Sequence, residues 1–194
     1  MQDEAARSEA ALPSRVADLF EQHSSPVFRS AYRITGSAED AEDVLQHVFL
    51  NLLQSASTSA WPVEPARYVQ RAAANASLDL LRRRRRWRLQ RLDDQLAPPL
   101  GNVEHVAASR LDEVRLVARL RSCLAEIPPL EAEVLVLHAF EGLGNTEIAT
   151  LLGKTPNYVG VLLHAARVRL RDLLHRDDTP PALDRRTRGP GDTP

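Results

Sequence analysis

The sequence lacks the features that would place it outside the cell or in a membrane. It contains a single cysteine, Cys123, so an internal disulfide is excluded and a buried thiol in a reducing compartment is the expected state. Its longest strongly apolar run, Val134 to Leu137, is far too short to cross a bilayer. The opening residues, MQDEAARSEAALPS, are acidic and lack the apolar segment of a signal peptide or anchor. These absences predict a cytoplasmic protein without membrane insertion.

Motifs of catalysis are also missing. The sequence has no phosphate-binding glycine loop, no G-x-S-x-G and no cysteine-pair zinc spacing. Glu39, Asp43 and His47 could align on one helix face as metal ligands, but solvated helix surfaces often show this spacing. No second cluster completes a coordination sphere. We therefore expect a protein that is not an enzyme and needs neither metal nor cofactor.

No stretch shows the alternation of a β-strand, whereas helical spacing recurs along the chain. With 194 residues, 43% of them apolar, the chain can bury a core in one or two domains. We expect an all-α protein with two small helical domains joined by a flexible linker that holds a proline pair and a glycine. The expected divisions are a disordered N-terminus at 1–13, a first domain at 14–91, the linker at 92–109, a second domain at 110–175 and a disordered tail at 176–194.

The most unusual stretch runs from Arg67 to Arg91. It holds nine arginines, no lysine and one acid, Asp79, in a chain whose net charge is −1. Guanidinium groups match phosphate oxygens, and neutralised phosphates release counterions, so nucleic acid is the natural partner. A solvated charge run is the alternative. Against it, Tyr68 to Leu81 is alanine- and leucine-rich at helical spacing, and Trp87 among the arginines can stack on an unpaired base.

Capping signals mark the helix boundaries in the first half. A helical pattern that starts at Ser14 stops at Gly36. Ser37, with Asp40 three residues later, resembles a capping box. It opens the clearest amphipathic helix of the chain, whose apolar positions run from Ala41 to Leu53.

The C-terminal part has the spacing of a helix-turn-helix. A short helix from Thr146 to Leu152 ends at Gly153, and Thr155 caps a last helix that runs to about Leu174. Such a second helix is free to enter the major groove of DNA. An ordinary helical hairpin is the alternative that these residues alone leave open.

Three motifs therefore follow one another: an acidic segment, DAEDVLQHVF, from Asp40 to Phe49, an arginine-rich helix with Asn75, and a helix-turn-helix. Together they resemble bacterial RNA polymerase sigma factors, in particular the extracytoplasmic-function (ECF) group of the sigma-70 family. The resemblance covers roughly Val16 to Leu174. It implies that the first domain is sigma region 2, which binds core polymerase and melts the minus-ten element. The second would be sigma region 4, which reads the minus-thirty-five element.

The resemblance also implies partners and site residues. The partners are core RNA polymerase, promoter DNA and an anti-sigma factor of open identity. The residues that match the polymerase-binding motif are Asp40, Asp43 and Gln46. Asn75 matches an asparagine that holds a flipped-out base, and the other expected minus-ten residues are Arg71, Arg82, Arg83, Arg84, Arg85, Arg86 and Trp87. The residues expected at the minus-thirty-five element are Thr155, Asn157, Tyr158, His164 and Arg167.

The recognition helix departs from the family pattern. Gly160, Leu162 and Ala165 stand where basic or polar residues are common, and Gly160 costs about 1 kcal/mol of helix stability relative to alanine. Leu162, if exposed, would be an apolar spot for a partner. We expect weak or unusual reading of the minus-thirty-five element.

Two alternatives remain. A helix-turn-helix regulator outside the sigma family accounts for the C-terminal motif but not for the acidic motif with Gln46. A sigma-like protein that acts mainly through protein partners fits the weakened recognition helix. For Trp61, a hydrophobic plug and a place near the melted strand are both open.

Overall fold

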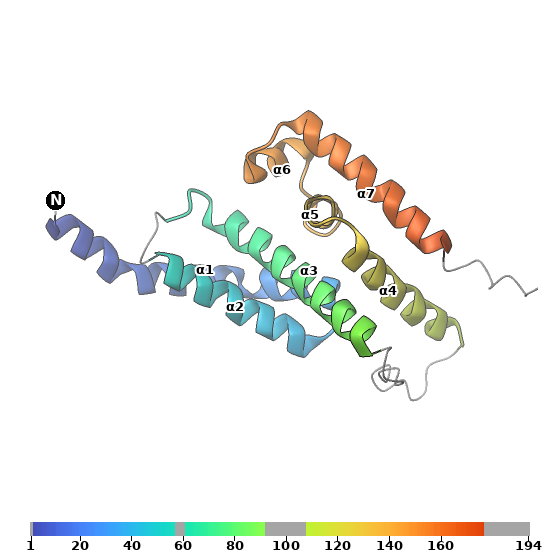
Figure 1. Cartoon of the computed structure of the whole chain (residues 1–194). Helices are drawn as coiled ribbons and strands as arrows, with labels where there is room; N and C mark the ends of the chain where they lie inside the picture. Colours follow the sequence, from blue (N-terminus) through green and yellow to red (C-terminus); the bar gives the residue numbers. More distant parts are fainter. Residues whose placement is uncertain (1, 57–60, 92–107, 177–194) are drawn as a thin grey trace, which may run out of the picture.

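A computed structural model of the protein describes residues 2–56, 61–91 and 108–176 (Figure 1). Every regular element within these ranges is a helix. This confirms the all-α prediction. Within these ranges no helix is long and apolar enough to cross a membrane. The helices are α1 (Gln2–Thr35), α2 (Ala38–Ala56), α3 (Pro65–Arg91), α4 (Ala108–Glu126), α5 (Pro129–Ala139), α6 (Asn145–Leu152) and α7 (Pro156–Arg176).

Helices α1, α2 and α3 form a first bundle around an apolar core. The stripe predicted from Ala41 to Leu53 faces this core for most of its length, because Val44, Val48 and Leu52 are buried. Trp61 packs on the same core, and the guanidinium of Arg15 lies 4.5 Å from its ring centroid. This packing agrees with the first alternative for Trp61, a hydrophobic plug.

The junction of α1 and α2 forms at Gly36, which has a positive φ of 75°. Ser37 caps α2 as predicted, since its Oγ accepts a hydrogen bond from the N–H of Asp40 at 3.3 Å. The Asp40 carboxylate does not reach back to Ser37. It accepts a hydrogen bond from Arg84 on α3, so only half of the predicted capping box forms.

The N-terminal boundary differs from the prediction. Helix α1 begins at Gln2, within the segment 1–13 for which disorder was expected. Four alanines and two glutamates lie in this segment, and both residue types are strong helix formers. Pro13 lies inside the helix, and the neighbouring Leu12 is buried.

The predicted linker and tail fall mostly outside the described residues, which omit 92–107 and 177–194. The last two linker residues, Ala108 and Ser109, belong to α4. Arg176, the first residue of the predicted tail, is the last residue of α7.

Helices α4 to α7 form a second bundle. Gly153 has a positive φ of 62° where the chain turns from α6 into α7. Thr155 caps α7 as predicted, since its Oγ1 accepts the Tyr158 N–H at 3.3 Å. Ile148 and Leu162 are both buried in the core that α6 and α7 share. Leu162 is therefore not an exposed apolar spot for a partner.

Helix α3 belongs to both bundles. Figure 1 shows it between the first two helices and the C-terminal four. Ile34 of α1 and Ala74, Leu78 and Leu81 of α3 lie in one apolar cluster with the core of the second bundle. The two domains are therefore docked on each other through buried apolar contacts.

Replacing Leu78 with alanine should lower the free energy of unfolding by about 2–5 kcal/mol, because its fully buried side chain leaves a cavity between α3 and the second bundle. Urea denaturation measures this change. Leu50→Ala is the control, since Leu50 is 55% exposed and its loss should cost no more than about 0.5 kcal/mol. Equal losses in the two variants would contradict the docked arrangement.

Candidate nucleic-acid interface

The basic end of α3 carries two kinds of arginine. Arg83, Arg86 and Trp87 are exposed, with Trp87 61% exposed. Within the described part of the chain, neither Arg83 nor Arg86 has an ion-pair partner. Arg82 and Arg85 are partly buried and pair with carboxylates, Asp79 for the first and Glu126 of α4 for the second. Only part of the predicted basic surface is thus free to meet phosphates.

Asp40 and Arg84 join α2 to α3. Arg84 Nη2 donates to Asp40 Oδ1 at 2.6 Å, and Asp40 is only 6% exposed. The first turn of α2 lies against α3, so the carboxylate points inward. Asp40, which matches the polymerase-binding motif, therefore does not lie on a face that is open to a partner. The pair anchors the basic half of α3 across the first bundle.

Arg71 and Asn75, the predicted minus-ten residues nearest the middle of α3, face the second bundle. Arg71 Nε donates to Glu133 Oε1 at 2.6 Å, and Asn75 Nδ2 donates to the same oxygen at 2.9 Å. Arg71 Nη1 also donates to the Leu151 carbonyl oxygen at 3.1 Å. Glu133 is 6% exposed. These two side chains are thus held by α5 and α6.

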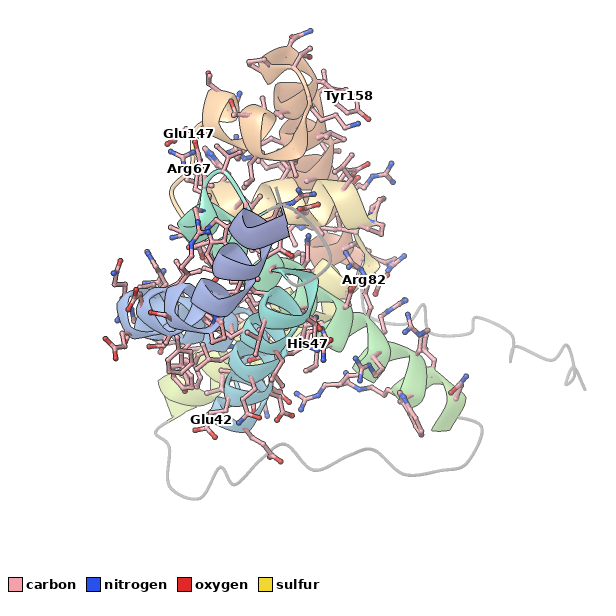
Figure 2. The ribbon with its side chains drawn as sticks, turned by 90° about the vertical axis from the view of Figure 1, so that its left-hand side faces the viewer. Glu42, His47, Arg67, Arg82, Glu147 and Tyr158 are labelled. Carbon is pink, nitrogen blue, oxygen red and sulfur yellow. The ribbon has the colours of Figure 1, made fainter. Side chains whose placement is uncertain are left out.

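A second ion pair joins α3 to the second bundle: Arg67 of α3 lies 2.8 Å from Glu147 of α6. Figure 2 shows these two side chains close together. The N–H of Gly144 donates to the other Glu147 oxygen at 2.9 Å, which caps α6 in place of a Gly144 side chain. This N–H, and after it the Arg67 guanidinium, lower the pKa of Glu147. The carboxylate therefore stays charged at neutral pH and keeps both contacts.

Arg121 of α4 joins the second bundle to the C-terminal end of α1. Its Nε donates to the Ile34 carbonyl oxygen at 3.0 Å and its Nη2 to the Arg33 carbonyl oxygen at 3.4 Å. These carbonyls end α1 and have no partner inside it, so a cation there is favourable. The guanidinium lies over Gly36, and burial lowers the pKa of Arg121.

The outer face of α2 is polar and open. Asp43 and Gln46 are exposed, as are Glu42 and His47, which Figure 2 labels. His47 Nε2 lies 2.8 Å from Asn51 Nδ2. Among the residues that the structure describes, no group of three His, Cys, Asp or Glu side chains is placed to hold a metal ion.

The predicted recognition helix, α7, exposes one polar face. All five expected contact residues are exposed: Thr155, Asn157, Tyr158, His164 and Arg167. Val161 lies on the surface with them and is 57% exposed. Gly160 faces Asn145 of α6, and a methyl group there would meet its Nδ2 at 3.5 Å, an ordinary contact. The exposed face of α7 therefore carries few charges near the start of the helix.

Glu133, Glu147 and Arg121 were not found from the sequence. Their partners lie far away in the chain, so no local spacing marks them. The one available signal was Glu133 itself, a charged residue within the otherwise apolar segment Ala132 to Leu137. A charge in such a segment is rarely buried without a partner.

Two family models match the chain. The model of sigma-70 region 2 matches residues 19–87, and the model of sigma-70 region 4 matches residues 118–170. The first therefore covers most of α1 to α3, and the second covers the helix-turn-helix with the preceding helices.

Several curated relatives are named ECF RNA polymerase sigma factors. The ECF RNA polymerase sigma factor SigE of Mycolicibacterium smegmatis is 33% identical over 181 residues, which are 91% of this chain and 68% of that protein. SigL of Mycobacterium tuberculosis, also an ECF RNA polymerase sigma factor, is 30% identical over 168 residues, 86% of this chain and 91% of that protein. The solved structure of CnrH in complex with the cytosolic domain of CnrY has a similar fold, with a TM-score of 0.52 and 23% identity over 89% of this chain and 96% of that chain.

Replacing Asp40 with alanine should lower the free energy of unfolding by about 1–2 kcal/mol, because Arg84 loses a buried acceptor but can still reach water. Asp43→Ala removes the same side chain from the exposed face of α2 and should change it by no more than about 0.5 kcal/mol. Thermal unfolding monitored by circular dichroism compares the two. If both variants unfold like the unaltered protein, Asp40 has no anchoring role.

Proposed function

The chain belongs to the sigma-70 family of RNA polymerase sigma factors, in its ECF group, and from this membership we propose which surfaces carry out each step. An ECF sigma factor is a transcription initiation factor: it binds core RNA polymerase and directs promoter recognition and DNA melting. It is a subunit and not an enzyme. Melting needs only a higher affinity for separated strands than for duplex.

Core polymerase binds, in this proposal, to the outer face of α2 through Asp43 and Gln46. Both side chains are exposed, and the apolar stripe on the opposite side of α2 packs the helix on the core of the first bundle. Asp40 has a supporting role, since its carboxylate holds Arg84. The observation that carries the proposal is this open acidic face beside the basic half of α3.

The minus-ten element binds along α3. The exposed guanidinium groups of Arg83 and Arg86 supply phosphate contacts, and Trp87 supplies a ring on which a base can stack. Asn75 can donate and accept along the edge of a base that has left the stack, and Arg71 lies one turn before it. Arg82, Arg84 and Arg85 add positive potential, and the ion pairs of Arg84 with Asp40 and of Arg85 with Glu126 also hold α3 against α2 and α4.

The minus-thirty-five element binds to α7. Its exposed face offers Thr155, Asn157, Tyr158, His164 and Arg167 to the major groove. The charged contact residue, Arg167, lies late in the helix, and the apolar Val161 is exposed between Tyr158 and His164. Affinity for this element is therefore low for a helix of this kind.

The arrangement of the chain follows from these surfaces. Residues 14–91 act as the domain that binds polymerase and the minus-ten element, and residues 110–175 act as the domain that binds the minus-thirty-five element. Residues 92–109 connect them at promoter spacing. The protein works in the cytoplasm, where its polymerase is.

An anti-sigma factor is a further proposed partner. Phe20 and Tyr32 of α1 are 43% and 48% exposed, and the ring of Tyr32 stacks on that of Phe28 at 6.3 Å between centroids. Exposed aromatic side chains gathered on one helix favour a protein partner.

Run-off transcription tests the assignment of α3. With purified core polymerase and a responsive promoter, the chain should start transcripts, and Asn75→Ala should reduce initiation by about tenfold, the effect of one lost base contact. Replacing Arg83 and Arg86 together should flatten the salt dependence of open-complex binding by about 0.7 per lost phosphate contact. Arg115→Ala is the control, since Arg115 lies on the exposed part of α4.

Two results would redirect this assignment. If the chain does not associate with core polymerase at all, the proposed polymerase and promoter surfaces fail together. If it binds promoter DNA strongly without polymerase, a helix-turn-helix regulator is the better description.

Footprinting tests α7 separately. Arg167→Ala should weaken protection of the upstream element by about three- to tenfold, because a charged contact in the major groove is lost. Arg176→Ala, at the far end of the same helix, should leave protection unchanged because its guanidinium already pairs with Glu126. Protection that survives the replacement of every polar residue on the exposed face would show that α7 does not read DNA.

A further inference from the structure

The carboxylate of Glu133 is buried in a place where a charge is costly. Six consecutive residues of α5, Ala132 to Leu137, are buried, and Glu133 is the only one of them that carries a charge. A buried carboxylate without partners costs several kcal/mol. Its partners come from the other domain, because Oε1 accepts from both Arg71 and Asn75 of α3. The second domain therefore depends on α3 to satisfy this group.

The partners of Glu133 are Asn75, which the proposed function assigns to a flipped-out base, and Arg71, which lies one turn before it among the proposed minus-ten residues. A carboxylate oxygen that accepts from a guanidinium and an amide offers them the same kind of acceptor as a phosphate or a base edge. A further donor of Arg71 is used by the Leu151 carbonyl oxygen. In this arrangement neither side chain can turn toward DNA without losing a short, partly buried hydrogen bond.

Three further contacts between the two bundles stabilise the docked arrangement. Arg67 pairs with Glu147 at one side, and Ser30 Oγ donates to Glu141 Oε1 at 2.5 Å at another. Arg121 closes the end of α1. By contrast, Asp43 and Gln46 on α2 remain exposed. The docked domains thus cover the proposed base-binding pair and leave the proposed polymerase face open.

We propose that Glu133 acts as an intramolecular competitor of single-stranded DNA: it occupies Arg71 and Asn75 while the two domains are docked, and it releases them when the domains separate. The inference rests on the proposed role of α3. The free chain then has a low affinity for separated strands, because only the undocked fraction binds. Any partner that favours separated domains raises that affinity by the same factor by which DNA favours the partner.

The test uses the full chain without polymerase and a fluorescein-labelled single-stranded oligonucleotide of mixed sequence, about 12 nucleotides long. Fluorescence anisotropy measures its affinity. Glu133→Gln should raise the affinity about three- to tenfold, because the docked state loses the charge of the ion pair between Glu133 and Arg71. Glu131→Gln is the matched control: it removes the same charge from the same helix, but Glu131 pairs with Arg169 inside the second domain, so the affinity should stay within about twofold.

A second variant weakens the docked state at a different contact, the one between α4 and the end of α1. Arg121→Gln leaves α3 and α5 untouched but removes the contacts to the Ile34 and Arg33 carbonyl oxygens. It should also raise the affinity, although it removes a positive charge from a chain that binds an anion. Adding Asn75→Ala to Glu133→Gln should abolish the gain, since the gain requires the released base-binding residue.

Hydrogen exchange, with a thermal unfolding curve for each variant, reports whether the domains have separated while each bundle stays folded. If exchange rises along α3 and α5 in Glu133→Gln and the oligonucleotide affinity stays equal to that of Glu131→Gln, the competition is refuted. It is refuted also if neither Glu133→Gln nor Arg121→Gln raises the affinity. The anisotropy and hydrogen-exchange measurements need no polymerase. A failure of run-off transcription would therefore overturn the proposed function, and the result for the competition by Glu133 could still be interpreted.

Discussion

The arrangement of the two domains depends on one buried charge. Glu133 lies in the apolar helix α5, and within the described part of the chain its hydrogen-bonding partners are on α3. The free energy that an unpaired carboxylate would cost at this position exceeds the stabilisation by a typical surface ion pair. Docking of α3 on α5 therefore has a polar cause as well as an apolar one. The apolar part, at Ala74 and Leu78, sets how closely the helices approach, and the polar part sets their register.

Helix α3 serves two purposes along its length because its composition changes. Its first half is rich in alanine, which allows close approach of α1 and α2 on one side and of α5 on the other. Its second half is dominated by arginine, and three of these side chains are used within the protein before any DNA is present. A run of like charges on one helix is thus partly compensated by Asp40, Asp79 and Glu126, and the remainder forms the free basic surface.

Local features of the fold could be predicted from the sequence and interactions between its parts could not. The caps at Ser37 and Thr155, the helix-turn-helix and the stripe from Ala41 to Leu53, except its exposed last residue Leu53, follow from spacing within a single segment. The burial of Asp40 does not, because it depends on an arginine that lies 44 positions further along the chain. The helix over residues 2–13 was not expected, although its alanine and glutamate residues favour a helix. The roles of the individual site residues in binding remain predictions.

Glycine at position 36 is favoured for two independent reasons, of which the backbone conformation is the strict one, because the Arg121 guanidinium is the far end of a flexible side chain. The backbone there has a positive φ of 75°, and an added Cβ would lie 2.3 Å from Arg121 Cζ. The first reason belongs to the turn between α1 and α2, and the second belongs to the contact with α4. If arginine at 121 were replaced by a shorter residue, the steric reason would vanish while the conformational one persisted. A loop inside one domain and the fit between the two domains therefore share a single residue, so neither can be redesigned without regard to the other.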